Sequence, residues 1–168
     1  GGSWDATNVA DGSVAVVTPI GLDHQRLLGD CLEAIATEKS GIIKDSSVLI
    51  SAVQEPEVAE ILLARCEEVG ARPVFEGDDI GVLARTPALG GQLVSLRGLA
   101  ADYEDLFLPL HGPYQAANAL LALAAVEAFV GGGEQRLERD VVEAAFAAFT
   151  SPGRLEVVRR SPTIMVDA

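Results

Sequence analysis

SVAVVTP, at residues 13–19, decides the fold class, because it is a continuous run of β-branched and other apolar side chains. Such a run is typical of a parallel strand that is buried on both faces. The pattern returns in SSVLISAV (46–53) and in the shorter RPVFEG (72–77), and helix patterns at 30–39 and 56–69 fill the two gaps. This alternation predicts an α/β fold with a parallel sheet and right-handed crossovers.

The chain then changes character, because three short strand patterns follow one another without helices between them. They are IGVLART (80–86), GQLVSLRGL (91–99) and YEDLFLPL (103–110), joined by Gly and Pro turns. Helix patterns resume at 113–130 and 140–149. We therefore expect a mostly parallel, doubly wound sheet that carries antiparallel edge strands.

Both ends of the chain suggest a larger protein. TSPGR (150–154) breaks the second helix pattern, and LEVVRR (155–160) and TIMVDA (163–168) resume as strands, which places a domain boundary near 151–153. The chain starts without Met in a Gly-rich segment and stops inside a strand pattern. Domains usually end at surface segments, so we expect an excerpt of a longer chain.

Composition narrows the class of protein. The 168 residues include 12 Lys+Arg and 25 Asp+Glu, so the formal net charge is -13. A field of this sign repels polyphosphates and anionic lipids, which argues against nucleic-acid and membrane partners. Two cysteines, Cys31 and Cys66, are a thin disulfide framework for a secreted protein, so a reduced cytosol is expected. The longest apolar run contains Glu127 and is interpreted as a buried helix rather than a membrane span.

Several polar residues stand where a ligand would bind an open parallel sheet, beyond the carboxyl ends of its strands. His24 follows the first strand, and it is either a metal ligand or base, or an ordinary loop histidine. Lys39 closes the next helix, where it could simply complement the helix dipole. Asp167 ends the last strand pattern.

The long helix carries two carboxamides on one face, Gln115 and Asn118. Gln115 could cap the helix, whereas Asn118 suits hydrogen bonding to a base edge or is a satisfied buried residue. Arg154, in the linker, could reach an anion or form a surface salt bridge. No P-loop, no G-x-G-x-x-G after a strand and no zinc spacing is present. The residues alone thus predict an α/β domain with a ligand-binding edge and no identified reaction.

Five segments stand out when they are taken together and in order. They are GGSWDATNV (1–9), TPIGLDH…EKSGIIK (18–44), HGPYQAANALLALAAVEAF (111–129), SPGRLE (151–156) and IMVDA (164–168). This set resembles the Mur-ligase superfamily, and specifically bacterial folylpolyglutamate synthases, which are often bifunctional with dihydrofolate synthase. The GG-x-x-DATNV and EK-x-GIIK patterns favour this folate branch over the cell-wall ligases.

That resemblance implies three parts: a folate-binding segment, a central P-loop ATPase domain and a C-terminal Rossmann-like domain that binds glutamate. Residues 1–150 resemble the second half of the ATPase domain, without its P-loop portion. Residues 151–168 resemble the linker and first strand of the glutamate-binding domain. The 168 residues alone are therefore expected to be inactive.

The resemblance also implies roles for individual residues. His24 corresponds to a ligand of the second magnesium ion, and Lys39 to a catalytic lysine that relatives carry as a carbamate, which holds Mg²⁺ through water. Arg154 corresponds to a second catalytic residue, at the phosphates. The residues that match the pterin-contacting loop are Trp4, Asp5 and Ala6. Those that match the adenine, phosphate and ribose contacts of ATP are Asn118, Arg154 and Asp167.

Two positions depart from the family pattern. Ser3 stands where the family usually has Arg, and Tyr114 replaces the usual His of the G-x-H-Q motif. A phosphate or water contact is expected to differ at these positions.

The implied function is an ATP-dependent ligase that adds L-glutamate to dihydropteroate, to the glutamyl tail of folates, or to both, through an acyl phosphate. The implied cofactors are ATP, two magnesium ions and a monovalent cation, and the implied enzyme is a cytoplasmic monomer. Two alternatives stay open at this point: another Mur-type amide ligase, and a nucleotide-binding paralogue without catalysis.

Overall fold

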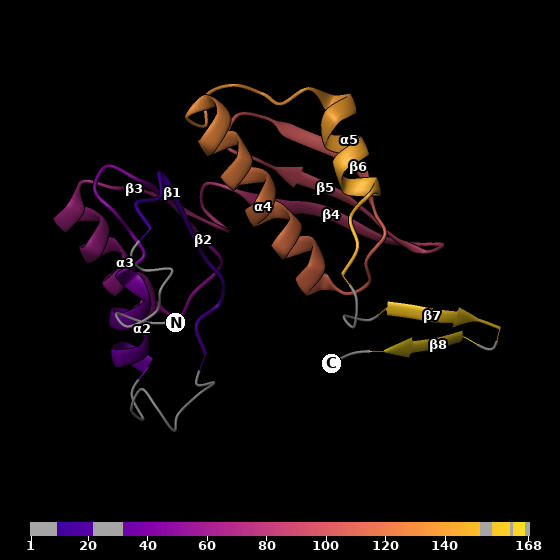
Figure 1. The fold of residues 1–168 in the computed structure, drawn as a ribbon, viewed down its shortest axis with the longest axis horizontal. Helices are drawn as coiled ribbons and strands as arrows, with labels where there is room; N and C mark the ends of the chain where they lie inside the picture. Colours follow the sequence, from indigo (N-terminus) through magenta and orange to yellow (C-terminus); the bar gives the residue numbers. More distant parts are fainter. Residues whose placement is uncertain (1–9, 22–31, 152–155, 162, 167–168) are drawn as a thin grey trace.

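A computed structural model describes most of the chain as two sheets with helices packed on them, followed by a short hairpin (Figure 1). The described residues are 10–21, 32–151, 156–161 and 163–166.

The first sheet is parallel and has the strand order β1-β2-β3, with β1 at Val14–Val17, β2 at Val48–Ser51 and β3 at Arg72–Phe75. The connections between these strands run through α2 (Leu32–Ser40) and α3 (Pro56–Val69), which pack against each other. The alternation of strand and helix predicted from the sequence is confirmed.

Successive side chains of the parallel strands enter two different cores, as the period of a strand requires. Leu49 packs with α2 and α3, whereas its neighbour Ile50 packs into the core of α4, and both side chains are fully buried. The central strand β2 is therefore buried on both faces. The sequence predicted the same for the apolar run of β1, but Val16 is 40% exposed, so one face of β1 is only partly covered in the described structure.

The antiparallel strands form a sheet of their own, with β4 at Gly81–Ala88, β5 at Gly91–Arg97 and β6 at Asp102–Leu108 in the order β4-β5-β6. The sequence predicted these three strands at the edge of the parallel sheet. Among the described residues they instead pair only with one another. Within the described residues, a single bridge between Glu76 and Ile80 links the end of β3 to the turn before β4.

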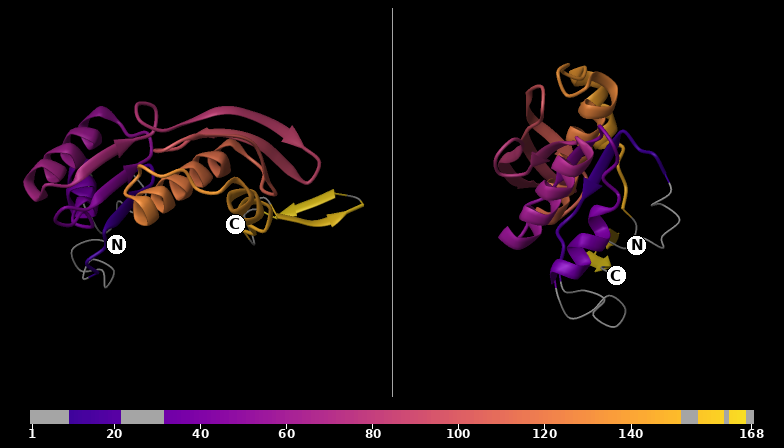
Figure 2. Two further views of the ribbon diagram at one scale, coloured as in Figure 1. Left: turned by 90° about the horizontal axis from the view of Figure 1, so that it is seen from above. Right: turned by 90° about the vertical axis from the view of Figure 1, so that its left-hand side faces the viewer.

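Two helices cover the antiparallel sheet, α4 (Pro113–Gly131) and α5 (Arg139–Ala147), as Figures 1 and 2 show. α4 also contacts β1 and β2, so it spans both sheets. Its length and composition alone would allow it to cross a membrane, and 44% of the relevant window is buried inside the protein. A core helix gives the same signal, and the packing of α4 on two sheets agrees with the buried helix expected from the sequence.

A buried carboxylate ties the helical layer to the antiparallel sheet. Glu127 of α4 is fully buried and accepts hydrogen bonds from the Leu99 N–H at 2.6 Å and from the Tyr103 hydroxyl at 2.8 Å. The same hydroxyl accepts a hydrogen bond from the Leu137 N–H at 2.9 Å, just before α5. Burial raises the pKa of Tyr103, and its hydrogen bond to Glu127 adds to the shift while the bond from Leu137 opposes it. One hydroxyl thus joins β6, α4 and the approach to α5.

After Ser151 the structure resumes with β7 (Glu156–Arg160) and β8 (Thr163–Val166), which pair as an antiparallel hairpin. The domain boundary near 151–153 stays a prediction, because residues 152–155 lie outside the described part of the chain.

Candidate functional site

The carboxyl edge of the parallel sheet is built from the segments that follow β1 and β2. Gln54, beyond β2, accepts a hydrogen bond from the Ile20 N–H at 2.9 Å and donates one to the Thr18 carbonyl at 3.1 Å. The segment after β1 is therefore held against the end of β2. His24, the residue predicted to act at this edge, lies outside the described residues.

The two lysines of the chain have different surroundings. Lys39 lies in the last turn of α2 and is exposed. Lys44 lies in the segment after α2, and its Nζ donates a hydrogen bond to the Gly41 carbonyl at 3.0 Å. Ile43, which lies between Gly41 and Lys44 in the sequence, is fully buried. Lys39 is thus the more exposed of the two lysines.

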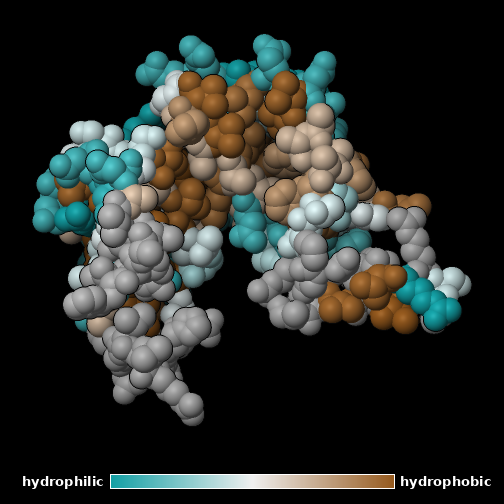
Figure 3. Space-filling model, viewed as in Figure 1, coloured by the Kyte–Doolittle hydropathy of each residue, from teal (hydrophilic) through white to brown (hydrophobic). Residues whose placement is uncertain are grey.

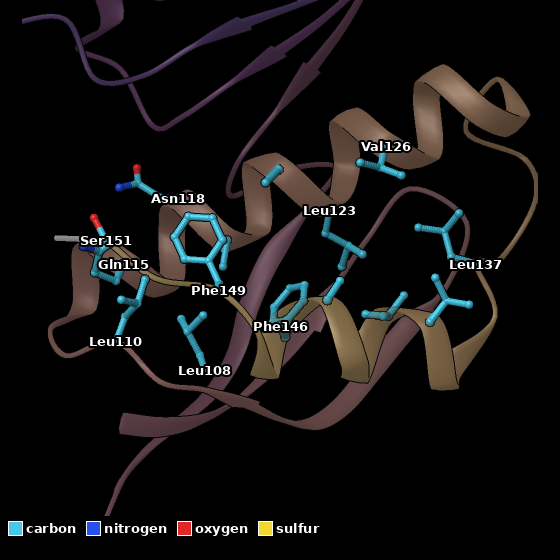
Figure 4. Close-up of a pocket in the computed structure, with 15 residues that line it drawn as sticks. Leu108, Leu110, Gln115, Asn118, Leu123, Val126, Leu137, Phe146, Phe149 and Ser151 are labelled. Atoms are coloured by element: carbon cyan, nitrogen blue, oxygen red, sulfur yellow. The ribbon is translucent and has the colours of Figure 1, made fainter. Parts of the chain in front are cut away.

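A groove of about 390 Å³ runs between α4 and α5 (Figure 4). Its walls are apolar, and its three polar lining residues, Gln115, Asn118 and Ser151, gather at one end of it. Figure 3 shows hydrophobic side chains over this helical layer. The apolar residues that line the groove are Leu108, Leu110, Ala119, Ala122, Leu123, Val126, Leu137, Val141, Val142, Ala145, Phe146 and Phe149. An apolar slot with a polar end suits a flat heterocycle that carries hydrogen-bonding atoms on its edge.

Asn118 is exposed, so it is not the satisfied buried residue that the sequence left open. Gln115 is buried and lines the groove, and the helix start at Gly112 has no side-chain cap, so Gln115 does not cap α4. Both carboxamides therefore belong to the groove.

The start of α4 is fixed from the antiparallel sheet. Gly112 has φ 95°, a conformation that favours glycine, and its carbonyl accepts a hydrogen bond from the buried Gln92 at 3.0 Å. Arg85 of β4 in turn donates to the side-chain Oε1 of Gln92 at 3.2 Å. This chain of contacts orients the start of α4, whose first two turns bear Gln115 and Asn118.

The structure describes two of the predicted site residues, Lys39 and Asn118, and does not bring them together. α2 and α4 pack on opposite faces of the parallel sheet. The predicted site residues that lie outside the described part of the chain are Trp4, Asp5, Ala6, His24, Arg154 and Asp167. The described residues contain no cluster of three or more His, Cys, Asp or Glu side chains that could hold a metal ion, so they do not by themselves form a magnesium site.

Sequence reasoning missed two parts of this arrangement. Gln54 carries no helix or strand signal. It lies three residues beyond β2 at the carboxyl edge of the sheet, and a polar residue at that position was the one signal that could have found it. The wall formed by Phe146 of α5 and by Phe149 just after this helix could not be foreseen, because it depends on how two helices pack.

Thiol chemistry is not favoured at Cys66. This free cysteine is buried in α3, and burial raises the pKa of its thiol while the nearby Arg65 opposes the shift. A buried thiol with a raised pKa stays protonated and unreactive, and its role is packing.

Comparison with known proteins places these features in a family context. No protein-family model matches the sequence. A Mycobacterium tuberculosis dihydrofolate synthase/folylpolyglutamate synthase is 50% identical over 175 residues, which cover 100% of this chain and 36% of that protein.

Solved structures agree with the sequence comparison. The M. tuberculosis folylpolyglutamate synthase complexed with ADP matches 98% of this chain and 37% of its own, with 48% identity and a TM-score of 0.92. A folylpolyglutamate synthase complex with AMPPCP and folate matches 97% of this chain and 40% of its own, with 31% identity and a TM-score of 0.91. The chain is therefore homologous over its whole length to bacterial dihydrofolate synthase/folylpolyglutamate synthases and spans a little over a third of their length.

Proposed function

We propose that this chain supplies part of the ATP-binding domain of a ligase that joins L-glutamate to dihydropteroate, to the glutamyl tail of folates, or to both. Residues 1–150 would form the second half of that domain, and residues 151–168 the linker and first strand of a glutamate-binding domain. The observation that carries the proposal is homology, over the whole length of this chain, to folylpolyglutamate synthases whose structures hold ADP or AMPPCP with folate. The complete protein, in the experiments below, is a polypeptide that contains this chain together with segments corresponding to the rest of the relatives' length.

The polar end of the groove is the proposed site of the adenine ring. A carboxamide offers one donor and one acceptor side by side, which matches the edge of adenine. Asn118 presents such a group to solvent at that end, and the apolar walls would cover the faces of the ring. Ser151 lines the same end, and the chain runs from it in three residues to Arg154, the proposed phosphate contact.

The proposed reaction has two steps. A substrate carboxylate attacks the γ-phosphorus of ATP, forming a C–O–P linkage and releasing ADP. The amine of L-glutamate then attacks the acyl carbon, loses a proton and expels phosphate, which leaves an amide. Both steps move negative charge, so a guanidinium at Arg154 would stabilise the transferring phosphoryl group.

Magnesium is proposed as a cofactor at two sites, together with a monovalent cation. His24 and a carbamate on Lys39 would be among the groups that hold Mg²⁺, directly or through water, because hard cations prefer oxygen donors. When bound, the ion would neutralise charge on the transferring phosphate. A monomeric, cytoplasmic enzyme is proposed as well, and the free, buried Cys66 supports a reducing compartment.

Asn118→Ala in the complete protein should raise the KM for ATP by about tenfold, the cost of one or two lost hydrogen bonds, and leave kcat nearly unchanged. A contact to the base acts equally on the ground state and the transition state, so it contributes uniform binding. Steady-state kinetics with varied ATP measure both constants.

The matched control is Gln135→Ala, which removes an exposed carboxamide from the segment after α4. Its kinetic constants should equal those of the wild type. A fall in kcat at an unchanged KM for ATP in Asn118→Ala would place this side chain at the reacting phosphate instead of the base.

A further inference from the structure

The parallel ladder between β1 and β2 continues beyond its last backbone rung. The final backbone bond runs from the Ala52 N–H to the Val17 carbonyl at 2.9 Å. The Gln54 side chain then takes the place of a peptide unit: its Nε2 donates to the Thr18 carbonyl at 3.1 Å and its Oε1 accepts from the Ile20 N–H at 2.9 Å.

This is the hydrogen-bond pattern of a parallel ladder. There, a residue donates to the carbonyl of the residue that precedes its opposite neighbour and accepts from the N–H of the residue that follows that neighbour. Here the opposite neighbour is Pro19, which has no N–H of its own. The carboxamide thereby satisfies the two polar groups that flank this proline.

Two further contacts limit the freedom of the segment. Gln54 Nε2 lies 3.2 Å from the hydroxyl of the fully buried Ser51, which donates to the Ala52 carbonyl at 2.9 Å. Ile20 is buried in the same core as Ile35 and Ile43, around α2. The segment from Thr18 to Gly21 is thus held by a side-chain amide on one side and by an apolar anchor on the other.

We propose that Gln54 is a positioning residue for the reaction centre of the ligase, a role that rests on the function proposed above. Open parallel sheets bind their ligands at the carboxyl edge, where Gln54 fixes the path of the chain. The segment that Gln54 holds, from Thr18 to Gly21, is the one that leaves β1 at this edge. Misplacement of a reacting group by about 1 Å can cost on the order of 100-fold in rate.

Gln54→Met and Gln54→Glu in the complete protein test this role. Methionine keeps the length of the side chain without either hydrogen bond, and glutamate keeps the acceptor for the Ile20 N–H but cannot donate to the Thr18 carbonyl. We expect kcat to fall at least tenfold in both variants and the KM for ATP to stay within about twofold, because the adenine groove on α4 is untouched.

Amide hydrogen exchange supplies a second readout. The Ile20 N–H should exchange at least about tenfold faster in Gln54→Met, in which its acceptor is lost, and less so in Gln54→Glu. Gln135→Met is the control, and it should change neither kcat nor the exchange of Ile20. If Gln54→Met does not fold, the loss of kcat in Gln54→Glu decides the matter.

A merely structural role would lower kcat and raise the KM for ATP together, in step with a lower Tm, and that outcome would overturn the proposal. So would a kcat within about twofold of the wild type while Ile20 exchanges faster. Absence of glutamate ligation by the wild-type complete protein would instead overturn the proposed function itself, and this role with it.

Discussion

Glu127→Ala should lower the free energy of unfolding by about 3 kcal/mol, because it leaves one buried and one partly buried donor without an acceptor. The Leu99 N–H and the Tyr103 hydroxyl both donate to this carboxylate, and the N–H is a main-chain group that cannot be removed. Because the Glu127 side chain is fully buried, its removal also leaves a cavity. Urea unfolding of the complete protein, followed by amide exchange at Leu99, measures the loss.

Gly98 gives a sharper test of the same contact through a double-mutant cycle. A Cβ at Gly98 would overlap with the Glu127 carboxylate, so Gly98→Ala should cost about 2 kcal/mol in the wild type. In the Glu127→Ala background this overlap is gone, and the cost of Gly98→Ala should fall by at least about 1 kcal/mol. Strict additivity of the two substitutions would show that Glu127 does not occupy this position.

Lys39→Ala should reduce kcat of the complete protein on the order of 100-fold, the loss expected for one electrostatic group at a transferring phosphate. The reason is the proposed carbamate, which forms when the neutral amine attacks CO2 and a proton is released. Bicarbonate or a short carboxylate such as acetate should then restore part of the activity by occupying the vacated space. Full activity of Lys39→Ala without any additive would contradict the assignment.

Two further variants separate the carbamate from a simple positive charge at this position. Lys39→Arg keeps the charge but forms no stable carbamate, so it should be as impaired as Lys39→Ala. Lys44→Ala removes the other lysine, whose amine bonds to the Gly41 carbonyl, and should retain kcat. A carbamate carbon signal in ¹³C NMR under ¹³CO2, lost in Lys39→Ala, would identify the group directly.

The strands and helices of the parallel layer could be predicted because each obeys a local rule. β2 is buried on both faces and is therefore a continuous apolar run, and β1 shows the same run although Val16 is exposed. α3 ends at Gly70, whose φ of 64° suits glycine and closes the helix with hydrogen bonds to the Cys66 and Glu67 carbonyls. Signals of this kind need no knowledge of distant parts of the chain.

The arrangement of the antiparallel strands could not be predicted in the same way. β4, β5 and β6 pair only with one another among the described residues, and strand propensity does not say which sheet a strand joins. The groove between α4 and α5 is equally non-local, since it depends on α5 packing against β6. Asn118 was foreseen from its odd polarity on an apolar helix, whereas Gln54 acts through a ladder that only the fold creates.

Glutamate ligation by the complete protein is the most direct test of the proposed function. The protein should be incubated with ATP, Mg²⁺, radiolabelled L-glutamate and either dihydropteroate or a reduced folate, and both ADP and labelled product should be counted. We predict one ADP released for each amide formed, with neither product when ATP or the acceptor is left out, and no ligation by the 168 residues alone, which contain no P-loop pattern. Absence of labelled amide from the complete protein with both acceptors, or ligation by the 168 residues alone, would contradict the proposal.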